Sequence, residues 1–393
     1  MLKNRDIVIT GLQPWDIEIG SNCKNIALEL SKNNRVLYVN APMTRSSRIK
    51  EKNDPRIQKR EKILKGEEKD IVEIKEKLWN LFPKTVLESI NQLGINPLFD
   101  FLNKINNKRF AKQIKSATNR LGFKNIIHFT DSDMFRSFYL KELLKPDIYI
   151  YYTRDNLISM PYWKKQGIRV EAKHMKKADL VVANSTYLSN LAKKFNPNSH
   201  YVGQGCDVSQ FDKKKVKNIP DDIKDIKKPI IGYIGALISL RLDIEIIYHI
   251  AKSKSDWSIV LVGPEDAKFK ASKLHELDNV HFLGNKDGNE LPSYLSAFDV
   301  ALNPQILTEL TIGNYPRKID EYLAMGVPTV ATKTEAMSIF KEHTYLAKNK
   351  EEYVELIQKA LDENNSEKEN SRSIFAQSHT WENNVKEIAK HIN

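Results

Sequence analysis

Residues 313–332 read Gly313-Asn-Tyr-Pro-Arg-Lys-Ile-Asp-Glu-Tyr-Leu-Ala-Met-Gly-Val-Pro-Thr-Val-Ala-Thr332. The pattern predicts a polar turn, then a short helix that Gly326 and Pro328 end, and directly after it a β-branched strand. Lys318 and Glu321 lie three residues apart, on one face of that helix. A helix start beside a lysine suits a phosphate, and a glutamate one turn further on suits the vicinal hydroxyls of a ribose. The alternative is an ordinary connection between helix and strand that carries a surface Lys–Glu pair.

Composition indicates a soluble globular protein of two domains. The chain has 393 residues, too many for one typical core, with 41% hydrophobic and 28% charged residues. No apolar run approaches the length that crosses a bilayer, and the segment Met1 to Trp15 is expected to form a first strand and not a signal peptide. Cys23 and Cys206 lack neighbours at zinc-ligand spacing, so we expect a reducing compartment, the cytoplasm.

Positive charge is concentrated in one part of the chain. The net charge is +12, and residues 45–124 hold twenty Lys and Arg against ten Asp and Glu, a local excess of +10. Such a surface attracts nucleic acids, anionic membranes and phosphorylated substrates alike. We expect a basic helical insertion at about 45–121, either as ordinary helices packed on a sheet or as an amphipathic surface for a membrane. Peripheral contact with the inner face of an anionic cytoplasmic membrane is compatible with this pattern.

Strand-like and helical segments alternate in two successive halves of the chain. Expected strands are residues 6–12, 35–40, 125–129, 147–152 and 179–183 in the first half, and 229–235, 257–263, 280–283, 299–302 and 329–331 in the second. Continuous β-branched runs of this kind suit parallel strands buried on both faces, so we predict an α/β fold with two doubly wound sheets. The expected domain bounds are 1–212 for the N-terminal domain, 213–228 for a linker, 229–374 for the C-terminal domain and 375–393 for a closing helix.

Several catalytic motifs are missing. The sequence lacks Gly-x-x-x-x-Gly-Lys-Ser/Thr, Gly-x-Gly-x-x-Gly after the first strand, Gly-x-Ser-x-Gly and His-Glu-x-x-His, which disfavours a P-loop NTPase and a dinucleotide oxidoreductase. The sequence Asp131-Ser-Asp133 follows a strand and has the residues to hold a divalent metal on nucleotide phosphates. Two aspartates at this spacing are also common in turns and N-caps, and we expect no metal site.

Groups at strand ends of the second half suit a nucleotide diphosphate. Gly235 would let a pyrophosphate approach the backbone, and Arg241 supplies a bidentate donor for it. Phe282 and Leu283 lie near the end of another strand, where backbone groups can read a base edge. Together with the lysine and glutamate of the opening stretch, these positions predict one nucleotide-diphosphate cleft.

Seven short blocks carry a family resemblance along nearly the whole chain. They are Ala178–Leu188, Val202–Phe211, Gly235–Arg241, Asn279–Gly284, Leu291–Leu295, Lys318–Gly326 and His379–Trp381. In this order they resemble the GT-B glycosyltransferases of the large retaining family 4, also called glycosyl transferases group 1. Two further stretches, Asp16–Asn22 and Tyr151–Asn156, look most similar to teichuronic-acid-type transferases of bacterial envelope polysaccharide synthesis. The resemblance implies two Rossmann-like domains that face each other across a cleft, with the closing helix packed back on the first.

The resemblance also implies an activity and roles for single residues. A sugar would pass from a UDP- or GDP-sugar to a hydroxyl of a bacterial surface glycan or glycolipid, with retention of the anomeric configuration. Glu321 matches the second Glu of the family's Glu-x7-Glu element and would hold the donor ribose. Arg241 and Lys318 would neutralise the leaving diphosphate without a metal. Gly20 matches a glycine turn that lies against the donor phosphates.

Two positions depart from the family pattern. Gly313 stands where the family has the first Glu of that element, and Ala236 stands where an Arg often follows the motif glycine. Asn314 and Glu309 are the candidates to replace the missing carboxylate. Both departures leave the donor sugar open and are compatible with reduced activity.

The first domain is expected to supply the acceptor side of the site. Its candidates are His128, Asp131, Arg154 and Asp155, placed at strand ends, and for each the alternative is a hydrogen-bonded structural residue. Three other functions stay open: a nucleic-acid-binding protein, a GT-B nucleotide-sugar epimerase, and a catalytically silent scaffold in a polysaccharide assembly complex. We expect no nucleic-acid partner, because the sequence lacks a helix-turn-helix, an RNA-recognition strand and zinc-finger spacing.

Overall fold

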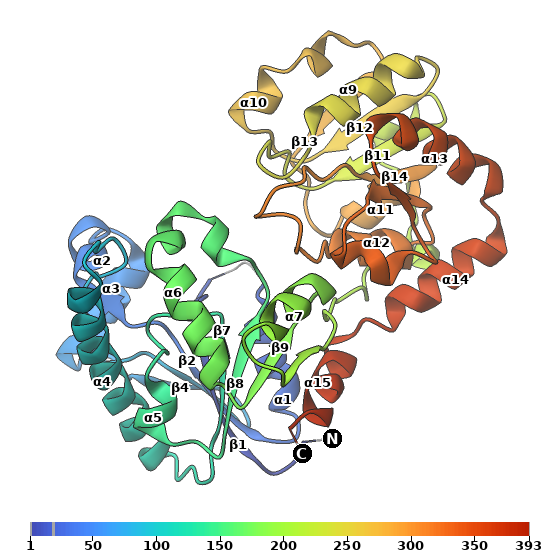
Figure 1. Ribbon diagram of the computed structural model, residues 1–393. Coiled ribbons are helices and arrows are strands. Elements are labelled where there is room, and N and C mark those ends of the chain that lie inside the picture. Colours follow the sequence, from blue (N-terminus) through green and yellow to red (C-terminus); the bar gives the residue numbers. More distant parts are fainter. Residues whose placement is uncertain (1, 18–19, 393) are drawn as a thin grey trace. The chain divides into compact units, whose positions relative to one another are not determined.

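The computed structural model describes residues 2–17 and 20–392 of the chain. The chain divides into two compact units, one of residues 1–205 and 381–393 and one of residues 206–380. Each unit contains a doubly wound α/β sheet (Figure 1), so the predicted fold class is confirmed. Among the described residues, no helix has both the length and the apolar character needed to span a bilayer.

The first unit is built on an eight-stranded sheet in the order β10-β9-β8-β7-β1-β2-β5-β4. Its strands are β1 (Asp6–Gly11), β2 (Arg35–Val39), β4 (Ile71–Lys75), β5 (Leu78–Leu81), β7 (Ile127–Asp131), β8 (Ile148–Thr153), β9 (Leu180–Ala183) and β10 (Ser199–Tyr201), with a separate pair β3 (Met43–Thr44) and β6 (Val86–Leu87). Its helices are α1 (Asn22–Leu30), α2 (Arg45–Lys50), α3 (Pro55–Lys65), α4 (Asn96–Arg120), α5 (Leu140–Leu144), α6 (Pro161–Lys177), α7 (Thr186–Lys193) and α15 (Trp381–Lys390). All neighbouring strands of the large sheet are parallel except β4 and β5.

Helices bury both faces of this sheet, as the continuous apolar strands predict. One face packs on α1 and on the C-terminal helix α15, whose Val385 and Ile388 join a core that contains Ile26 (Figure 1). Asn384 fixes α15 in this place, because its Nδ2 donates to the carbonyl oxygens of Val202 and Gly203 at 2.9 and 2.8 Å. The other face packs on α4 and α6. The last helix of the chain is therefore a part of the first unit.

The basic insertion expected at 45–121 is only partly helical. Between α3 and α4, residues 71–81 form the β4–β5 hairpin, which extends the edge of the sheet beside β2. Four of the five residues of β4 are exposed, and these include the charged residues Glu73 and Lys75. These two charged residues lie on an exposed edge strand and not on a helix.

The second unit is built on a six-stranded parallel sheet in the order β13-β12-β11-β14-β15-β16. Its strands are β11 (Ile230–Ile234), β12 (Ser258–Val262), β13 (Val280–Gly284), β14 (Val300–Asn303), β15 (Thr329–Thr332) and β16 (Tyr345–Ala347). Its helices are α8 (Asp221–Lys224), α9 (Ile244–Ser253), α10 (Ala267–Lys270), α11 (Leu291–Ser296), α12 (Lys318–Ala324), α13 (Lys350–Glu363) and α14 (Ser366–Gln377). α9 and α13 cover one face, and α11, α12 and α14 cover the other.

The structural division of the chain differs from the expected domain bounds of 212 and 375. Phe211 and Ile223, which flank the expected linker or lie in it, are buried in the core of the second unit with Ile230. α14 packs on α12 in the same unit, where the Arg372 Nε donates to the Gly326 carbonyl oxygen at 2.9 Å. The chain passes between the units at residues 205–206 and 380–381.

Candidate functional site

The topology of the second sheet locates its ligand-binding edge. β11 lies between β12 and β14, so the connections that leave β11 and enter β14 run to opposite sides of the sheet. Doubly wound sheets bind their ligands in the crevice at such a point, outside the carboxyl ends of the strands. The residues that follow β11 and β14, and the helix α12 that follows β14 in the chain, therefore form the candidate site.

Three neighbouring strands of this sheet end in glycines with positive φ. They are Gly235 after β11, Gly263 after β12 and Gly284 at the end of β13, with φ of 139°, 147° and 68°. A Cβ on Gly263 would lie 2.1 Å from the Gly235 carbonyl oxygen, and a Cβ on Gly235 would lie 2.9 Å from the Lys318 Nζ. Side chains are thus excluded here, and bare backbone forms the surface that a ligand would meet. Sequence reasoning found Gly235 and missed Gly263, although it also directly follows a strand.

Lys318 is the first residue of α12 and reaches back to the end of β11. Its Nζ donates to the Tyr233 hydroxyl and lies 4.0 Å from the centroid of that ring. The residue as a whole is half-buried, but its ammonium is shielded from water, and this burial lowers the pKa of Lys318 to about 7. Glu321 opposes the shift and Arg241 adds to it. The sequence analysis did not predict the contact between Tyr233 and Lys318, because Tyr233 lies inside a strand 85 residues before the lysine.

Glu321 lies one turn further along α12. Burial raises the pKa of its carboxyl group, while the charges of Arg317 and Lys318 act in the opposite direction. Within residues 2–17 and 20–392, no hydrogen bond to this carboxylate is formed. The group is therefore open to a ligand that donates two hydrogen bonds, as a ribose does.

Two further side chains of α12, Asp320 and Tyr322, fix the helix on the core. Tyr322 donates its hydroxyl hydrogen to the Ile234 carbonyl oxygen at 3.2 Å, and the Ile234 N–H donates to that hydroxyl at 3.0 Å. Asp320 is fully buried and accepts hydrogen bonds from the Tyr315 hydroxyl at 2.8 Å and from the His379 Nδ1 at 2.6 Å. These contacts set the rotation of α12, so Lys318 and Glu321 are left for the edge of the sheet.

Arg241 and Asn314 are brought together beside this edge. Arg241 is exposed in the loop between β11 and α9. With its side-chain amide in the orientation that satisfies both neighbours, Asn314 donates to the Leu310 carbonyl oxygen and accepts from the Arg241 Nη1, each at 3.2 Å. Gly313 is buried next to them, and Glu309 lies exposed in the same loop.

Phe282 and Leu283 lie in β13, two strands away from β11 and directly before Gly284. Both residues are half-buried. The Phe282 ring stacks on the His275 ring with centroids 3.9 Å apart and an angle of 8° between planes. This stacked pair flanks the glycine end of β13.

The sequence analysis expected His128 of the first unit at a strand end, but the structure places it elsewhere. It lies inside β7, has no exposed surface, and its Nε2 is 3.1 Å from the Thr10 Oγ1. Burial lowers the pKa of His128 to about 3, so the ring is neutral at physiological pH. A buried neutral histidine inside the sheet does not contact a substrate, and this candidate is therefore corrected to a structural residue.

Asp131, Arg154 and Asp155 do lie together at the carboxyl ends of β7 and β8. The Arg154 Nε donates to the Asp131 Oδ1 at 2.8 Å, and its Nη1 donates to the Asp155 Oδ2 at 3.0 Å. Burial works against the charged guanidinium, but the two carboxylates outweigh it and raise the pKa of Arg154. The second oxygen of Asp131 is buried without a hydrogen bond to the described residues.

The remaining first-unit candidates are more exposed or already paired. Gly20 is exposed just before α1, where the Ser21 Oγ accepts from the Lys24 N–H and caps the helix. Glu18 and Ile19 of the same expected turn lie outside the described residues. Asp133 is bound by Arg136, whose Nε donates to its Oδ1 at 3.1 Å. Both aspartates of Asp131-Ser-Asp133 are thus bonded to arginines.

Comparisons with known proteins show that part of this chain is similar to glycosyltransferases. Residues 228–363, which lie in the second unit, match the family model described as "Glycosyl transferases group 1". A protein of Bacillus subtilis (strain 168), named "Putative teichuronic acid biosynthesis glycosyltransferase TuaH", is 28% identical over 252 residues, 61% of this chain. That alignment spans 62% of the relative's own length.

Solved structures show the fold of the whole chain. Anabaena Alr3699/HepE, in complex with UDP, matches with a TM-score of 0.66 at 14% identity, over 98% of each chain. Sucrose-phosphate synthase from Thermosynechococcus elongatus matches with a TM-score of 0.65 at 15% identity, also over 98% of each chain. The chain thus has the GT-B fold, and residues 228–363 match the model of the glycosyl transferases group 1.

Proposed function

We propose that the chain transfers a sugar from a nucleotide-diphosphate sugar to a hydroxyl of a bacterial surface glycan or glycolipid, with retention of the anomeric configuration. The observation that carries the proposal is the grouping of Gly235, Lys318 and Glu321 at the switch point of the second sheet. Bare backbone and a partly desolvated ammonium suit a diphosphate, and the unbonded carboxylate suits a ribose. The complexes of Anabaena Alr3699/HepE with UDP and with UDP-glucose favour a uridine donor over a guanosine donor.

The same groups provide the chemistry that the reaction needs. Breaking the anomeric C–O bond leaves negative charge on the departing diphosphate, and catalysis requires groups that stabilise this charge. Lys318 and Arg241 supply two positive charges at the edge, so the proposed reaction needs no metal. An anionic ligand favours the protonated form of Lys318, which burial disfavours in the free protein.

We place the acceptor side of the reaction in the first unit. Asp131, Arg154 and Asp155 remain its candidate polar groups, because they lie at the carboxyl ends of β7 and β8. The proposed compartment is the cytoplasm, where the buried thiols of Cys23 and Cys206 would stay reduced. A catalytically silent scaffold is the second candidate, favoured by the buried Gly313 at the position of the family's first glutamate.

Contact with an anionic membrane is the proposed way to reach a lipid-linked acceptor. The exposed face of α4 begins with Leu98 and Phe101, whose exposed fractions are 42% and 62%, and continues with Lys104 and Lys108. α6 lies beside this end of α4, since Arg169 donates to both carboxylate oxygens of Asp100 at 2.8 and 2.9 Å. Apolar residues next to lysines suit the interface of an anionic bilayer.

Nucleotide binding is the first expected result. A thermal-shift screen of UDP, GDP, ADP and CMP should show stabilisation by UDP, by roughly 2.7 kcal/mol at about 100 times the dissociation constant. Glu321→Ala should abolish most of this shift, because the ribose loses its acceptor, while Glu342→Ala on the exposed surface of the same unit should keep it. Equal shifts in wild type and Glu321→Ala would remove Glu321 from the site.

The affinity should also depend on pH. Below its pKa of about 7, Lys318 is charged and binds the diphosphate, and above it the neutral amine does not. The affinity for UDP-glucose should therefore fall by roughly tenfold between pH 6 and pH 8, measured by titration calorimetry. Lys318→Arg keeps a positive charge over this range and should show a flat profile. If the affinity of Lys318→Arg for UDP-glucose fell with pH as steeply as that of the wild type, Lys318 would not be the group that binds the diphosphate.

Turnover should depend on the two cations. Lys318→Ala and Arg241→Ala should each lower kcat by about 10²-fold, because the leaving diphosphate loses a stabilising charge. Lys341→Ala, which removes an exposed lysine of the same unit, should leave kcat unchanged. Sugar transfer is measured with radiolabelled donor and membrane-derived acceptor. Normal turnover in Lys318→Ala would defeat this role, and nucleotide binding without any transfer would favour the scaffold.

Membrane contact is tested by co-sedimentation with vesicles that contain or lack anionic lipid. The wild type should bind the anionic vesicles, and Phe101→Ser should bind them about tenfold more weakly because an apolar anchor is lost. Phe195→Ser removes another exposed phenylalanine of the same unit and serves as the control. Failure of the wild type to bind either kind of vesicle would remove the membrane contact.

A further inference from the structure

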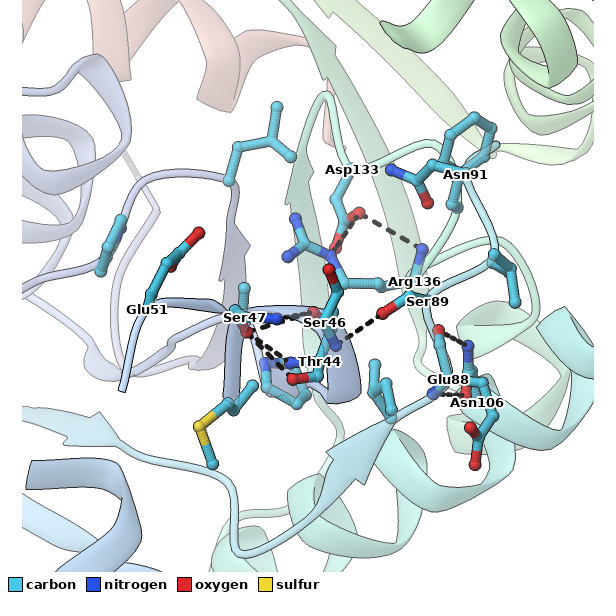
Figure 2. Close-up of a pocket in the computed structure, with 18 of the residues that line it drawn as sticks. Thr44, Ser46, Ser47, Glu51, Glu88, Ser89, Asn91, Asn106, Asp133 and Arg136 are labelled. Atoms are coloured by element: carbon cyan, nitrogen blue, oxygen red, sulfur yellow. Dashed lines mark hydrogen bonds and ion pairs between the residues drawn. The ribbon is translucent and has the colours of Figure 1, made fainter. Parts of the chain in front are cut away.

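The first unit contains a cavity of about 780 Å³, shown in Figure 2. Leu12, which follows β1, and Ala41, which follows β2, contribute to its wall. Asp133, Phe135 and Arg136 follow β7 and contribute to it as well. The cavity therefore lies at the carboxyl edge of the sheet, beside the point between β1 and β7 where the connections diverge. Its volume falls in the range of about 300–1,000 Å³ that is typical of small-molecule sites.

One wall of the cavity is polar and held in place by hydrogen bonds. In α2, the Ser47 N–H donates to the Thr44 Oγ1 at 3.2 Å, and the Ser47 hydroxyl donates to the Thr44 carbonyl oxygen at 3.0 Å. The Ser46 N–H donates to the Ser89 Oγ at 3.0 Å and thereby ties α2 to the segment before α4 (Figure 2). The hydroxyl of Ser46 and the amide of Asn91 form no hydrogen bond with the described residues, so both can bind a ligand.

A second wall is aromatic. Trp163 packs against Phe135 with ring centroids 5.5 Å apart, and Tyr162 meets Trp163 edge to face at 5.0 Å. Phe135 is buried in a small core with Met134 and Val170, which holds the aromatic wall rigid. Half of the Tyr162 side chain remains exposed at the wall. Rings presented this way pack well against the flat apolar face of a sugar ring.

Each guanidinium group that lines the cavity is held in an ion pair. Arg136 pairs with Asp133 at 3.1 Å, Arg56 pairs with Asp54, and Arg60 pairs with Asp16 at 3.0 Å. No lining guanidinium is therefore left with an uncompensated charge for an anion.

The lining carboxylates are paired too, with one exception. Glu88 is bound by Arg45 and Arg109, and its backbone is fixed by Asn106, which accepts from the Glu88 N–H at 2.8 Å. Glu51 forms no ion pair with the described residues. Glu51 is exposed and its charge acts on Arg56, so the described lining has no cation free to attract an anionic ligand, and Glu51 offers an acceptor for hydroxyl groups.

We infer that this cavity is a subsite for an uncharged sugar of the acceptor, whose hydroxyls bond Ser46, Asn91 and Glu51 and whose ring packs on Trp163. The inference rests on the proposed function, because a transferase of this kind needs a saccharide acceptor in addition to its donor. It goes beyond that function by naming the chemical class, an uncharged glycan and not a uronic acid or a phosphorylated sugar. The nucleotide is not its ligand, since the cavity lacks both a glycine edge and an unpaired cation.

Saccharide binding to the full chain tests the inference. The probes are malto-, cello- and chito-oligosaccharides, with oligogalacturonates as the anionic counterpart, and dissociation constants come from saturation-transfer NMR titrations. One of the uncharged series should bind at least about tenfold more tightly than the oligogalacturonates, and Glu51→Gln should narrow this difference. Binding of oligogalacturonates as tight as that of every uncharged series would overturn the inference.

Variants locate the binding in the cavity. Asn91→Ala and Trp163→Ala should each weaken the uncharged saccharide by about tenfold, because a hydrogen bond or a stacking surface is lost. Asn119→Ala, on the exposed C-terminal end of α4 and outside the cavity, should bind like the wild type. Thermal melting shows whether each variant is folded. If Trp163→Ala does not fold, the binding measurement on Asn91→Ala alone tests the location. Unchanged binding in Asn91→Ala would overturn the location.

The UDP thermal shift, measured on the same preparation, separates this inference from the proposed function. If UDP binds and no saccharide does, the inference fails and the proposed function stands. If the saccharide binds in the cavity and no nucleotide does, the sugar site stands and the transferase role falls. If neither binds, both fail.

Discussion

A buried carboxylate determines the arrangement of the candidate nucleotide site. Asp320 lies in the core of the second unit, where an ionised group is tolerated only with close hydrogen-bonding partners. Tyr315 and His379 provide them, one from the loop before α12 and the other from the segment after α14. Because this carboxylate can be satisfied in one place only, α12 has one rotation about its axis. Lys318 is then fixed at the end of β11, where its hydrogen bond to the Tyr233 hydroxyl adds to these contacts.

This anchoring explains how Lys318 can be held in an unfavourable position. Its ammonium is packed against the Tyr233 ring and close to Gly235, with little water around it. Burial of an ammonium costs stability, and the lowered pKa of Lys318 reflects that cost. The bonds of Asp320 and Tyr322 hold the backbone beneath it, so the strain is not released by rotation of the helix. An incoming diphosphate would relieve the cost, which is how a preorganised cation contributes to catalysis.

The alternation of strands and helices could be predicted from the sequence, because parallel strands buried on both faces are continuous apolar runs. Local motifs also predicted that Gly235, Lys318 and Glu321 lie near one another, as the structure shows, while their part in binding stays a prediction. The contacts of Tyr233, Asp320 and His379 could not be predicted from the sequence, because they join residues far apart in the chain. The β4–β5 hairpin was missed because an exposed edge strand has the composition of a charged helix.

His128 shows a different reason for an incorrect prediction. Along β7 successive side chains point to opposite faces of the sheet, and only the last positions reach the edge. Only two residues lie between His128 and Asp131, which is enough to move a side chain from the end of the strand into the interior of the sheet. Both residue types are common in active sites, so composition could not distinguish them. Asp131 is the last residue of β7 and pairs with Gly11 at the end of β1, and although its side chain is also fully buried, it bonds Arg154 beyond the strand end.

The carboxyl edges of the two sheets, where doubly wound folds bind their ligands, are built differently. In the second unit the carboxyl edge is bare, because glycines end β11, β12 and β13 and leave the backbone itself as the binding surface. In the first unit the loops after β1 and β2 are covered by α2, which turns the same edge into a walled cavity. A glycine edge beside Lys318 lets a compact diphosphate approach the backbone closely, whereas walls of serine, asparagine and tryptophan suit a larger uncharged ligand. The insertion between β2 and α4 therefore makes the chemistry of the first unit different from that of the second.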